Sequence, residues 1–204
     1  MIEKFHKTEV VKNVILQSIE VKKSILSNPA LIEKIILLAD ECVQSIRNGG
    51  KILFCGNGGS FADAQHLSAE LTSRFLFDRP GLPSLVLGAN SSAATAIGND
   101  YGYEYVFARE IEAIAHPTDY IIGITTSGNS NNILRAIEAA NVRKVPMVVL
   151  TGNTGGKLPK TTKTINVAST DTARIQECHI LMGHIICEII EATLFSKVTN
   201  NSLT

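Results

Sequence analysis

The sequence lacks an excess of charge of either sign. Its 204 residues include 19 basic and 19 acidic side chains, so its formal net charge at pH 7 is zero. Proteins that bind nucleic acids or anionic lipids use strongly basic surfaces, and this even balance offers none. We therefore expect no nucleic-acid partner and no membrane partner. A small neutral or anionic molecule is the expected ligand.

Long hydrophobic runs are missing as well. No run reaches the roughly 18 consecutive apolar residues that a membrane span requires. The start of the chain, where a secretory signal would carry its apolar core, is interrupted by charges at Glu3, Lys4, Lys7, Glu9 and Lys12. We expect a soluble, cytoplasmic protein.

The cysteines lack the C-x-x-C spacing of a zinc ribbon or a redox motif. The four of them, Cys42, Cys55, Cys178 and Cys187, stand singly inside apolar segments. This pattern favours neither a disulfide framework nor a structural zinc site. We predict that all four are reduced and serve as small core residues.

Repeats, low-complexity tracts and charge runs that would divide the chain are absent. The hydrophobic content of 45% and the mean hydropathy of +0.15 are typical of a globular chain that buries a core. We predict a single domain over residues 1–204. It consists of a helical preface (1–48), an α/β core with a last helix (49–197) and a short tail (198–204).

The preface is predicted to contain two helices. Apolar residues recur at mostly helical spacing over 8–27. Asn28 followed by Pro29 has the pattern of an N-cap and a first helical position. The second helix is predicted to end near Asn48, because two glycines follow it.

Short apolar segments then alternate with helical ones, which predicts a doubly wound, mainly parallel five-stranded sheet flanked by helices, as in flavodoxin-like folds. Continuous apolar character is typical of parallel strands covered on both faces. The predicted strands are 52–55, 84–87, 120–124, 147–150 and 164–167, and the predicted helices are 60–77, 92–98, 103–115, 130–143 and 172–197. Ligands of such sheets bind beyond the carboxyl ends of the strands, which directs attention to the loops 56–60, 88–92 and 125–130.

The first of these loops reads Gly-Asn-Gly-Gly-Ser and leads into a helix. Its glycines would let backbone N–H groups approach a ligand, and Ser60 with Asp63 has the spacing of a capping box with Asp in place of Glu. The G-x-G-x-x-G spacing of a dinucleotide site is absent, so a nicotinamide cofactor is not expected. A tight turn without a ligand is the alternative.

The loop 125–130 reads Thr-Thr-Ser-Gly-Asn-Ser and offers four hydroxyls at the start of a helix. Such a helix N-terminus attracts anions. A Walker loop would add a lysine for nucleotide charge, and its absence favours the phosphate monoester of a sugar. Simple helix capping by these hydroxyls is the alternative.

Ionisable side chains on two helices form the third candidate element. His66 and Glu70 are four residues apart, so they lie on one helical face. They could be two metal ligands, an acid–base pair or an ordinary hydrogen-bonded pair. The apolar last helix also carries polar residues that need a reason, namely Gln176, Glu177, His179, His184 and Glu188. Helical geometry cannot choose among them, and solvent or a neighbouring subunit is an ordinary destination for Glu177 and Glu188.

Four segments of the sequence resemble the phosphoheptose isomerases of the sugar isomerase (SIS) fold. They are GNGGSFADAQHLSAELTSRF, AIGNDYGYEYVFARE, TTSGNSNN and TARIQECHILMGHIICEIIE. Together they span nearly the whole chain and join a phosphate loop to His-x3-Glu and Gln-x7-His elements. The resemblance implies a homotetramer with sites at its subunit interfaces. It also implies conversion of sedoheptulose 7-phosphate to glycero-manno-heptose 7-phosphate through an enediol, the first step towards activated heptose for lipopolysaccharide, capsule or glycoprotein.

The resemblance also implies the site residues. Its zinc ligands, for one zinc per subunit, fall on His66, Glu70, Gln176 and His184, so the resemblance chooses Gln176 over Glu177. Its catalytic residues are Glu70, as the base at carbon, and His184, as acid or base at oxygen. Its substrate-binding positions fall on Asn57, Gly58, Gly59, Ser60, Glu70, Arg74, Asn99, Asp100, Thr125, Thr126, Ser127, Ser130 and Gln176. Some family members carry an acid where this chain has Ala173, and no role of that acid carries over.

Other functions on the same fold remain open. A related regulator binds the bacterial replication initiator without turnover, but it lacks the histidine that stands here as His184. An isomerase or etherase for another sugar phosphate would not need the zinc-type set. A sugar-phosphate sensor would carry an appended DNA-binding domain, and we expect none here, which makes this function less favoured.

Overall fold

The computed structural model describes residues 6–195, and residues 1–5 and 196–204 lie outside the described part. At its centre is a sheet of five strands in the order β2-β1-β3-β4-β5, and every neighbouring pair is parallel. The strands are β1 (Ile52–Gly56), β2 (Ser84–Val86), β3 (Tyr120–Ile124), β4 (Met147–Thr151) and β5 (Lys163–Asn166). This is the flavodoxin-like strand order, so the predicted sheet is confirmed.

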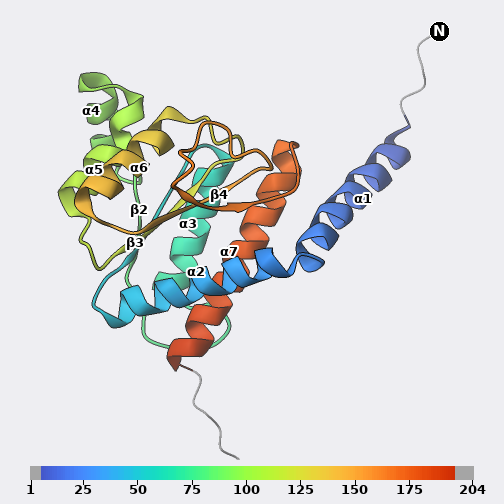
Figure 1. Ribbon diagram of the computed structural model, residues 1–204, viewed down its shortest axis with the longest axis horizontal. Coiled ribbons are helices and arrows are strands. Elements are labelled where there is room, and N and C mark those ends of the chain that lie inside the picture. The colour runs from blue at the N-terminus through green and yellow to red at the C-terminus, as the bar shows by residue number, and fades with distance from the viewer. Residues whose placement is uncertain (1–5, 196–204) are drawn as a thin grey trace, which may run out of the picture.

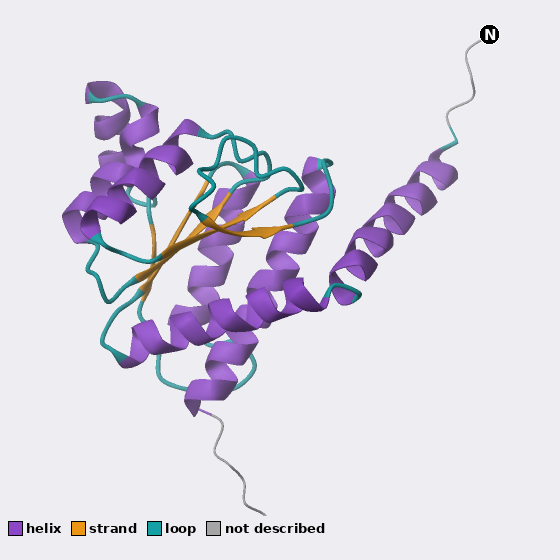
Figure 2. Ribbon diagram, in the orientation of Figure 1, coloured by secondary structure: helices purple, strands orange, loops and turns teal. Residues whose placement is uncertain are grey.

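Helices cover both faces of the sheet (Figures 1 and 2). One face is covered by α2 (Pro29–Arg47), α3 (Gly59–Thr72) and α7 (Thr172–Phe195), and α1 (Lys7–Leu26) contacts α2 and α7 rather than the sheet. The other is covered by α4 (Ser91–Asp100), α5 (Val106–Ile114) and α6 (Asn131–Arg143), with the short 3-10 helix η1 (Tyr103–Tyr105) before α5. The predicted helix over 103–115 is therefore two elements.

Alternation along the strands divides the core in two. Ile52 and Phe54 of β1 pack against the α2, α3 and α7 side, whereas Leu53 and Cys55 pack against the α5 and α6 side. Successive side chains of a strand point to opposite faces, and both faces are covered, so the whole of β1 is buried. The four cysteines are buried and unpaired, in agreement with the prediction.

Local signals set most of the helix boundaries. The Asn28 side chain accepts a hydrogen bond from the N–H of Leu31 at 3.1 Å, and Pro29 opens α2 as predicted. The predicted capping box of α3 is wrong, because Gly58 is the N-cap and Ser60 already lies inside the helix. The predicted extent of that helix to residue 77 is also wrong, because α3 ends at Thr72.

The last helix has the length and apolar composition of a membrane span. Ten of its residues are buried in the described structure, where it packs against α2 and α3, and core helices of soluble proteins have the same composition. Its predicted end at residue 197 lies outside the described residues. By contrast, α1 buries only Ile25 and projects from the body of the molecule in Figure 1.

Candidate active site

The first predicted loop joins the carboxyl end of β1 to α3. Gly58 has φ +55° and ψ −121°, a conformation that residues with a Cβ rarely adopt. At Gly59 a Cβ would lie 2.5 Å from Nε2 of Gln176. Glycine at these positions lets the amide of Gln176, on α7, lie directly against the start of α3. Ser60, which follows, is buried.

The second predicted loop joins β3 to α6 and is shaped by hydroxyl groups. The Thr125 hydroxyl accepts a hydrogen bond from the N–H of Gly128 at 3.3 Å and lies 3.4 Å from the Ser130 hydroxyl. Thr125 is buried, whereas Ser127 is exposed. Thr125 therefore holds the turn, and Ser127 is left to meet a ligand at the N-terminus of α6, where the helix dipole favours an anion.

A polar hollow of about 190 Å³ lies beside this second loop. The loop lines one side with Thr126, Ser127 and Asn129, and the segment leading into α7 lines the other with Ser169, Thr170 and Thr172. Hydroxyl and amide groups dominate this lining, and no lysine or arginine is among the described residues that form it. The hollow suits a phosphate held by neutral donors.

An asparagine pair connects the two loops. Asn57 donates to Asn132 at 2.9 Å, and Asn132 donates back to Asn57 at 2.8 Å. The hydroxyl of Tyr103 adds a third bond to the Asn57 side chain at 3.1 Å. Asn132 is buried, so this pair fixes the first turn of α6 against the loop that opens α3. Neither Asn132 nor Tyr103 was among the predicted site residues.

The strongest concentration of reactive groups lies between α3 and α7. Nε2 of His66 is 3.1 Å from the Glu70 carboxylate and 2.9 Å from Nε2 of His184. One ligand atom from each of the three side chains falls within 4.8 Å of the others. His66 is half exposed, and Glu70 and His184 are partly buried. We call these three residues the His-Glu-His cluster.

Two neighbours give the cluster its geometry. A Cβ at Gly183 would lie 2.4 Å from the Leu67 side chain, so this glycine lets α7 approach α3 closely and bring His184 to His66. The ring of Phe75 stacks on His184 with centroids 5.6 Å apart and an interplanar angle of 29°. Neither residue was predicted, although a glycine inside an apolar helix is a signal of close packing.

A second acid, Asp63, lies beside the cluster. Burial raises the pKa of the Asp63 carboxyl, against the lowering effect of His66, and one oxygen of Asp63 is buried without a hydrogen bond among the described residues. The sequence indicated this residue only as half of a capping box. Its place one turn before His66 makes it a further polar neighbour of the cluster.

The structure distinguishes the two α7 residues that helical spacing left open. Gln176 lies against Gly59, whereas Glu177 accepts a hydrogen bond from Arg174 at 2.6 Å and lies 3.6 Å from the Lys22 ammonium. Gln176 is two helical turns from His184, about 12 Å along the axis. Within the described part of this single chain, no hydrogen bond joins its amide to the His-Glu-His cluster.

Three other predicted site residues, Arg74, Asn99 and Asp100, are exposed. Arg74 is exposed in the segment after α3. Asn99 and Asp100 end α4, bonded to each other at 2.8 Å and exposed. Figure 1 places α4 well away from α3 and α7. Within one chain Asn99 and Asp100 are therefore not gathered at the cluster, whereas Arg74 directly precedes Phe75, whose ring stacks on His184.

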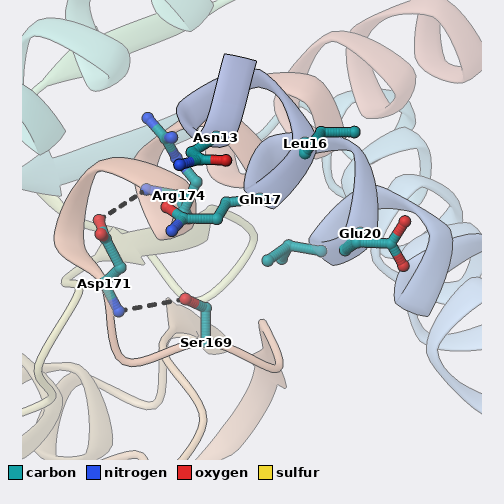
Figure 3. A pocket seen from close by; sticks show the side chains of 8 residues that line it. Asn13, Leu16, Gln17, Glu20, Ser169, Asp171 and Arg174 are labelled. Carbon is teal, nitrogen blue, oxygen red and sulfur yellow. Dashed lines mark hydrogen bonds between the residues drawn. The ribbon is translucent and has the colours of Figure 1, made fainter. Parts of the chain in front are cut away.

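A wider hollow lies elsewhere, between α1 and the start of α7 (Figure 3), with a volume of about 550 Å³. Arg174 reaches across it and donates to the carbonyl oxygen of Val14 at 2.9 Å. Asp171 caps α7 by accepting from the N–H of Ala173 at 2.8 Å. This hollow lacks the histidines of the cluster, and its position marks the joint between the projecting helix and the core.

The residues of the cluster fit a metal ion. Two imidazole nitrogens and a carboxylate form a donor set that zinc commonly takes in proteins. The same three groups are also proton carriers. The loop at the carboxyl end of β1 opens the helix that carries His66, and the Asn57–Asn132 pair connects it to the loop after β3, so both loops can offer neutral donors to an anion. The arrangement therefore suits proton transfer on a small phosphorylated molecule.

Comparison with known proteins agrees with this arrangement. Residues 13–152 match the SIS domain family, so the fold and its loops define an SIS domain protein. The phosphoheptose isomerase of Aneurinibacillus thermoaerophilus is 49% identical over 188 residues, which cover 92% of this chain and 95% of that protein. The chain belongs to the phosphoheptose isomerase family.

Solved structures of the same family superpose closely. The phosphoheptose isomerase of Neisseria gonorrhoeae has a TM-score of 0.84 at 40% identity, over 92% of this chain and all of that one (100%). The enzyme from Francisella tularensis has a TM-score of 0.85 at 35% identity, over 91% and 98% of the two chains. The match therefore extends over the whole fold, including α3 and α7.

Proposed function

We propose that this protein is an aldose–ketose isomerase that converts D-sedoheptulose 7-phosphate to D-glycero-D-manno-heptose 7-phosphate, the first step of activated-heptose biosynthesis. The observation that carries the proposal is the His-Glu-His cluster, whose ligand atoms lie within 4.8 Å of one another. It combines a carboxylate and two imidazoles on α3 and α7, the helices that begin at the loop 56–60 and at the polar hollow. Membership of the phosphoheptose isomerase family supports the choice of substrate.

The reaction moves one proton between carbons and one between oxygens. A proton leaves C1 of the ketose and returns at C2, while the oxygen-bound proton shifts between O1 and O2 through a cis-enediol. Glu70 is the proposed base at carbon, because its carboxylate is partly buried and points at His66. His184 is the proposed acid or base at oxygen. Each positioned group of this kind contributes roughly 10²- to 10⁴-fold to the rate.

One zinc ion per subunit is the proposed cofactor, held by His66, Glu70 and His184. When bound, it would polarise the carbonyl and stabilise negative charge on the neighbouring oxygens. Gln176 is the fourth proposed ligand, on the resemblance alone. A carboxylate that binds metal tightly is a weaker base, so Glu70 must exchange between the two tasks during turnover.

The phosphate is proposed to lie at the two loops. The binding residues are Asn57, Gly58, Gly59 and Ser60 in one loop and Thr125, Thr126, Ser127 and Ser130 in the other. Binding energy gained at the phosphate, remote from the reacting carbons, orients the chain for proton transfer. Glu70 and Gln176 are proposed to contact the sugar. Arg74, next to Phe75, is a further proposed contact, and Asn99 and Asp100 are proposed contacts that a neighbouring subunit would have to bring to the site.

A cytoplasmic homotetramer with sites at its subunit interfaces is the proposed assembly. The helix α1 supports this, because Val11, Ile15 and Leu16 are 58%, 54% and 56% exposed. An exposed apolar stripe on a projecting helix is typical of a protein interface. Light scattering of the purified chain tests it, and a stable monomer would contradict it.

Turnover of D-sedoheptulose 7-phosphate by the purified full chain tests the function. We expect formation of the aldose phosphate, loss of activity after chelation and recovery when zinc is added back. Activity that survives complete chelation would remove the metal from the proposal. A folded tetramer that stays inactive with zinc restored would contradict isomerase function on this substrate and favour an SIS regulator or another sugar phosphate.

A further inference from the structure

A buried ion pair outside the His-Glu-His cluster connects the segment after α3 to the end of α7. Nε of Arg79 is 2.9 Å from the Glu191 carboxylate, and both side chains are 1% exposed. Desolvation makes a buried ion pair weak evidence for stability, since apolar residues of similar size often serve as well. Stability alone therefore does not explain why this ion pair is buried among apolar helices.

The arginine binds the end of α3. Its guanidinium donates to the carbonyl oxygens of Glu70 at 2.8 Å, Leu71 at 2.6 Å and Ser73 at 3.1 Å. Carbonyls at a helix C-terminus have no partner within the helix, and a cation there is favoured by the helix dipole. One of these carbonyls belongs to Glu70 itself, so Arg79 holds the backbone from which the cluster carboxylate projects.

The glutamate holds the segment that follows. Its carboxylate accepts hydrogen bonds from the N–H of Phe75 at 2.9 Å and of Leu76 at 2.7 Å. These N–H groups would otherwise continue α3, so their capture explains why the helix ends at Thr72. Burial acts to raise the pKa of Glu191, but these hydrogen bonds and Arg79 outweigh it and lower the pKa. The carboxylate therefore stays charged.

The two ends of the ion pair meet again at the cluster. Arg79 fixes the backbone of Glu70, and Glu191 fixes the backbone of Phe75, whose ring stacks on His184. Glu191 also lies seven residues after His184 on α7, two helical turns along the same side. A single buried pair thus fixes the backbone that carries the Glu70 carboxylate and the backbone that carries the ring against His184.

We propose that Arg79 and Glu191 are positioning residues, which hold Glu70 and His184 in the geometry that binds metal and transfers protons. This inference rests on the proposed function for its kinetic readout, but its structural and metal-binding readouts do not require turnover. The hydrogen bonds of the pair go to backbone groups and to each other, and the Arg79 guanidinium also lies over the ring of Phe195, so these contacts are not with the side chains of the cluster.

The test is Glu191→Gln, with Asp119→Asn as its matched control. Asp119 is also a buried carboxylate paired with a cation, 2.6 Å from Nζ of Lys51, and it also accepts from two backbone N–H groups, those of Lys51 and His116. It lies at the opposite, amino end of the sheet. Both substitutions remove one charge without changing shape, so calorimetry should show a lower Tm for each.

Only Glu191→Gln should disturb the cluster. Outer partners of metal ligands are typically worth about 10- to 100-fold in metal affinity or activity. We expect such a loss in zinc affinity, measured by competition with a chromophoric chelator, and a fall in kcat with little change in KM. A crystal structure of the metal-free variant should show Phe75 displaced from His184. Arg79→Lys, which keeps the charge but not the fork of donors, should lie between wild type and Glu191→Gln.

Phe75→Leu separates positioning from folding, because it keeps the backbone N–H that Glu191 binds and removes only the stacked ring. It should lower zinc affinity with a smaller loss of Tm. Wild-type zinc affinity in folded Glu191→Gln, or an equal loss in Asp119→Asn, would overturn the inference. A wild-type chain that binds zinc but fails to turn over the heptulose phosphate would instead contradict only the proposed function.

Discussion

The helices on the two faces of the sheet bury different kinds of side chain. On the α5 and α6 face the packing is made almost wholly by Val, Ile, Phe and Ala, with Asn132 as the buried polar residue of these two helices. On the α3 and α7 face the last helix buries Arg174, His179 and Glu191 among its apolar residues. Buried ionisable groups cost free energy unless they are paired. The described structure buries no acidic or basic side chain of α5 or α6 but three of α7, and α7 also supplies His184 to the His-Glu-His cluster.

The largest expected effect concerns Glu70. Glu70→Gln should lower kcat for the heptulose phosphate by about 10²- to 10⁴-fold, because the amide cannot accept a proton, while the Tm stays near that of wild type. Glu112→Gln on α5 is the matched control, since Glu112 is an exposed helical acid paired with Arg109 at 3.5 Å. An active Glu70→Gln enzyme would refute the proposed mechanism.

The second prediction concerns pH and His179. Burial lowers the pKa of His179 from 6.5 to about 4, only partly offset by the backbone of Thr151. In the unfolded chain His179 binds a proton at a higher pH than in the folded protein. The free energy of unfolding is therefore unaffected by His179 above about pH 6.5 and decreases as the pH falls towards 4. The loss should reach about 3 kcal/mol.

Urea unfolding of wild type and His179→Leu between pH 7 and pH 4.5 checks this. The difference between the two proteins isolates His179 from other titrating groups. We expect the wild type to lose stability relative to the variant over this range. Parallel curves would show that His179 is not the source of the acid sensitivity.

The sequence predicted the regular parts of both faces well. The strands came from continuous apolar runs, which local pattern alone defines, and Asn28 with Pro29 marked the start of α2. The end of α3 was missed, because Glu191, which binds Arg79 and the N–H of Phe75, lies more than a hundred residues away in sequence. Local propensity has no access to such contacts.

The candidate site was predictable to a similar degree. The i, i+4 spacing indicated His66 with Glu70, but not the approach of His184, which depends on the packing of Leu67 against Gly183. Spacing also left Gln176 and Glu177 equivalent until the packing of α7 separated them. Residue spacing misses what tertiary contact creates, and only the resemblance to the phosphoheptose isomerases grouped His184 with His66 and Glu70 from sequence.

The third prediction tests that packing. Gly183→Ala places a methyl group 2.4 Å from Leu67, and overpacking of this kind costs about 1–3 kcal/mol. It should also push α7 from α3 and weaken zinc binding. Gly98→Ala on α4, where no heavy atom lies within 4 Å of the new Cβ, should be neutral or stabilising by up to about 1 kcal/mol.

Calorimetry and chelator competition on the two variants compare the faces directly. Adding Leu67→Ala to Gly183→Ala removes the overlap, so zinc affinity should recover even though the core loses apolar contacts. Unchanged zinc affinity in Gly183→Ala would show that the cluster does not depend on this close approach.

The smallest expected effect concerns Ser127, in the loop before α6. Through this loop the α5 and α6 face of the sheet contributes to the proposed site. Ser127 is exposed at the start of α6, and its hydroxyl accepts only a 3.2 Å hydrogen bond from the N–H of Asn129. A hydrogen bond to a charged group contributes about 1.5–3 kcal/mol, so Ser127→Ala should raise KM by about tenfold or more with kcat largely kept. Thr118→Ala, in the loop at the opposite end of β3, should leave both constants unchanged. If Ser127→Ala lowers kcat instead, then the loop before α6 affects the reacting carbons as well as the phosphate. Phosphate binding and proton transfer would then not be separated between the two faces of the sheet.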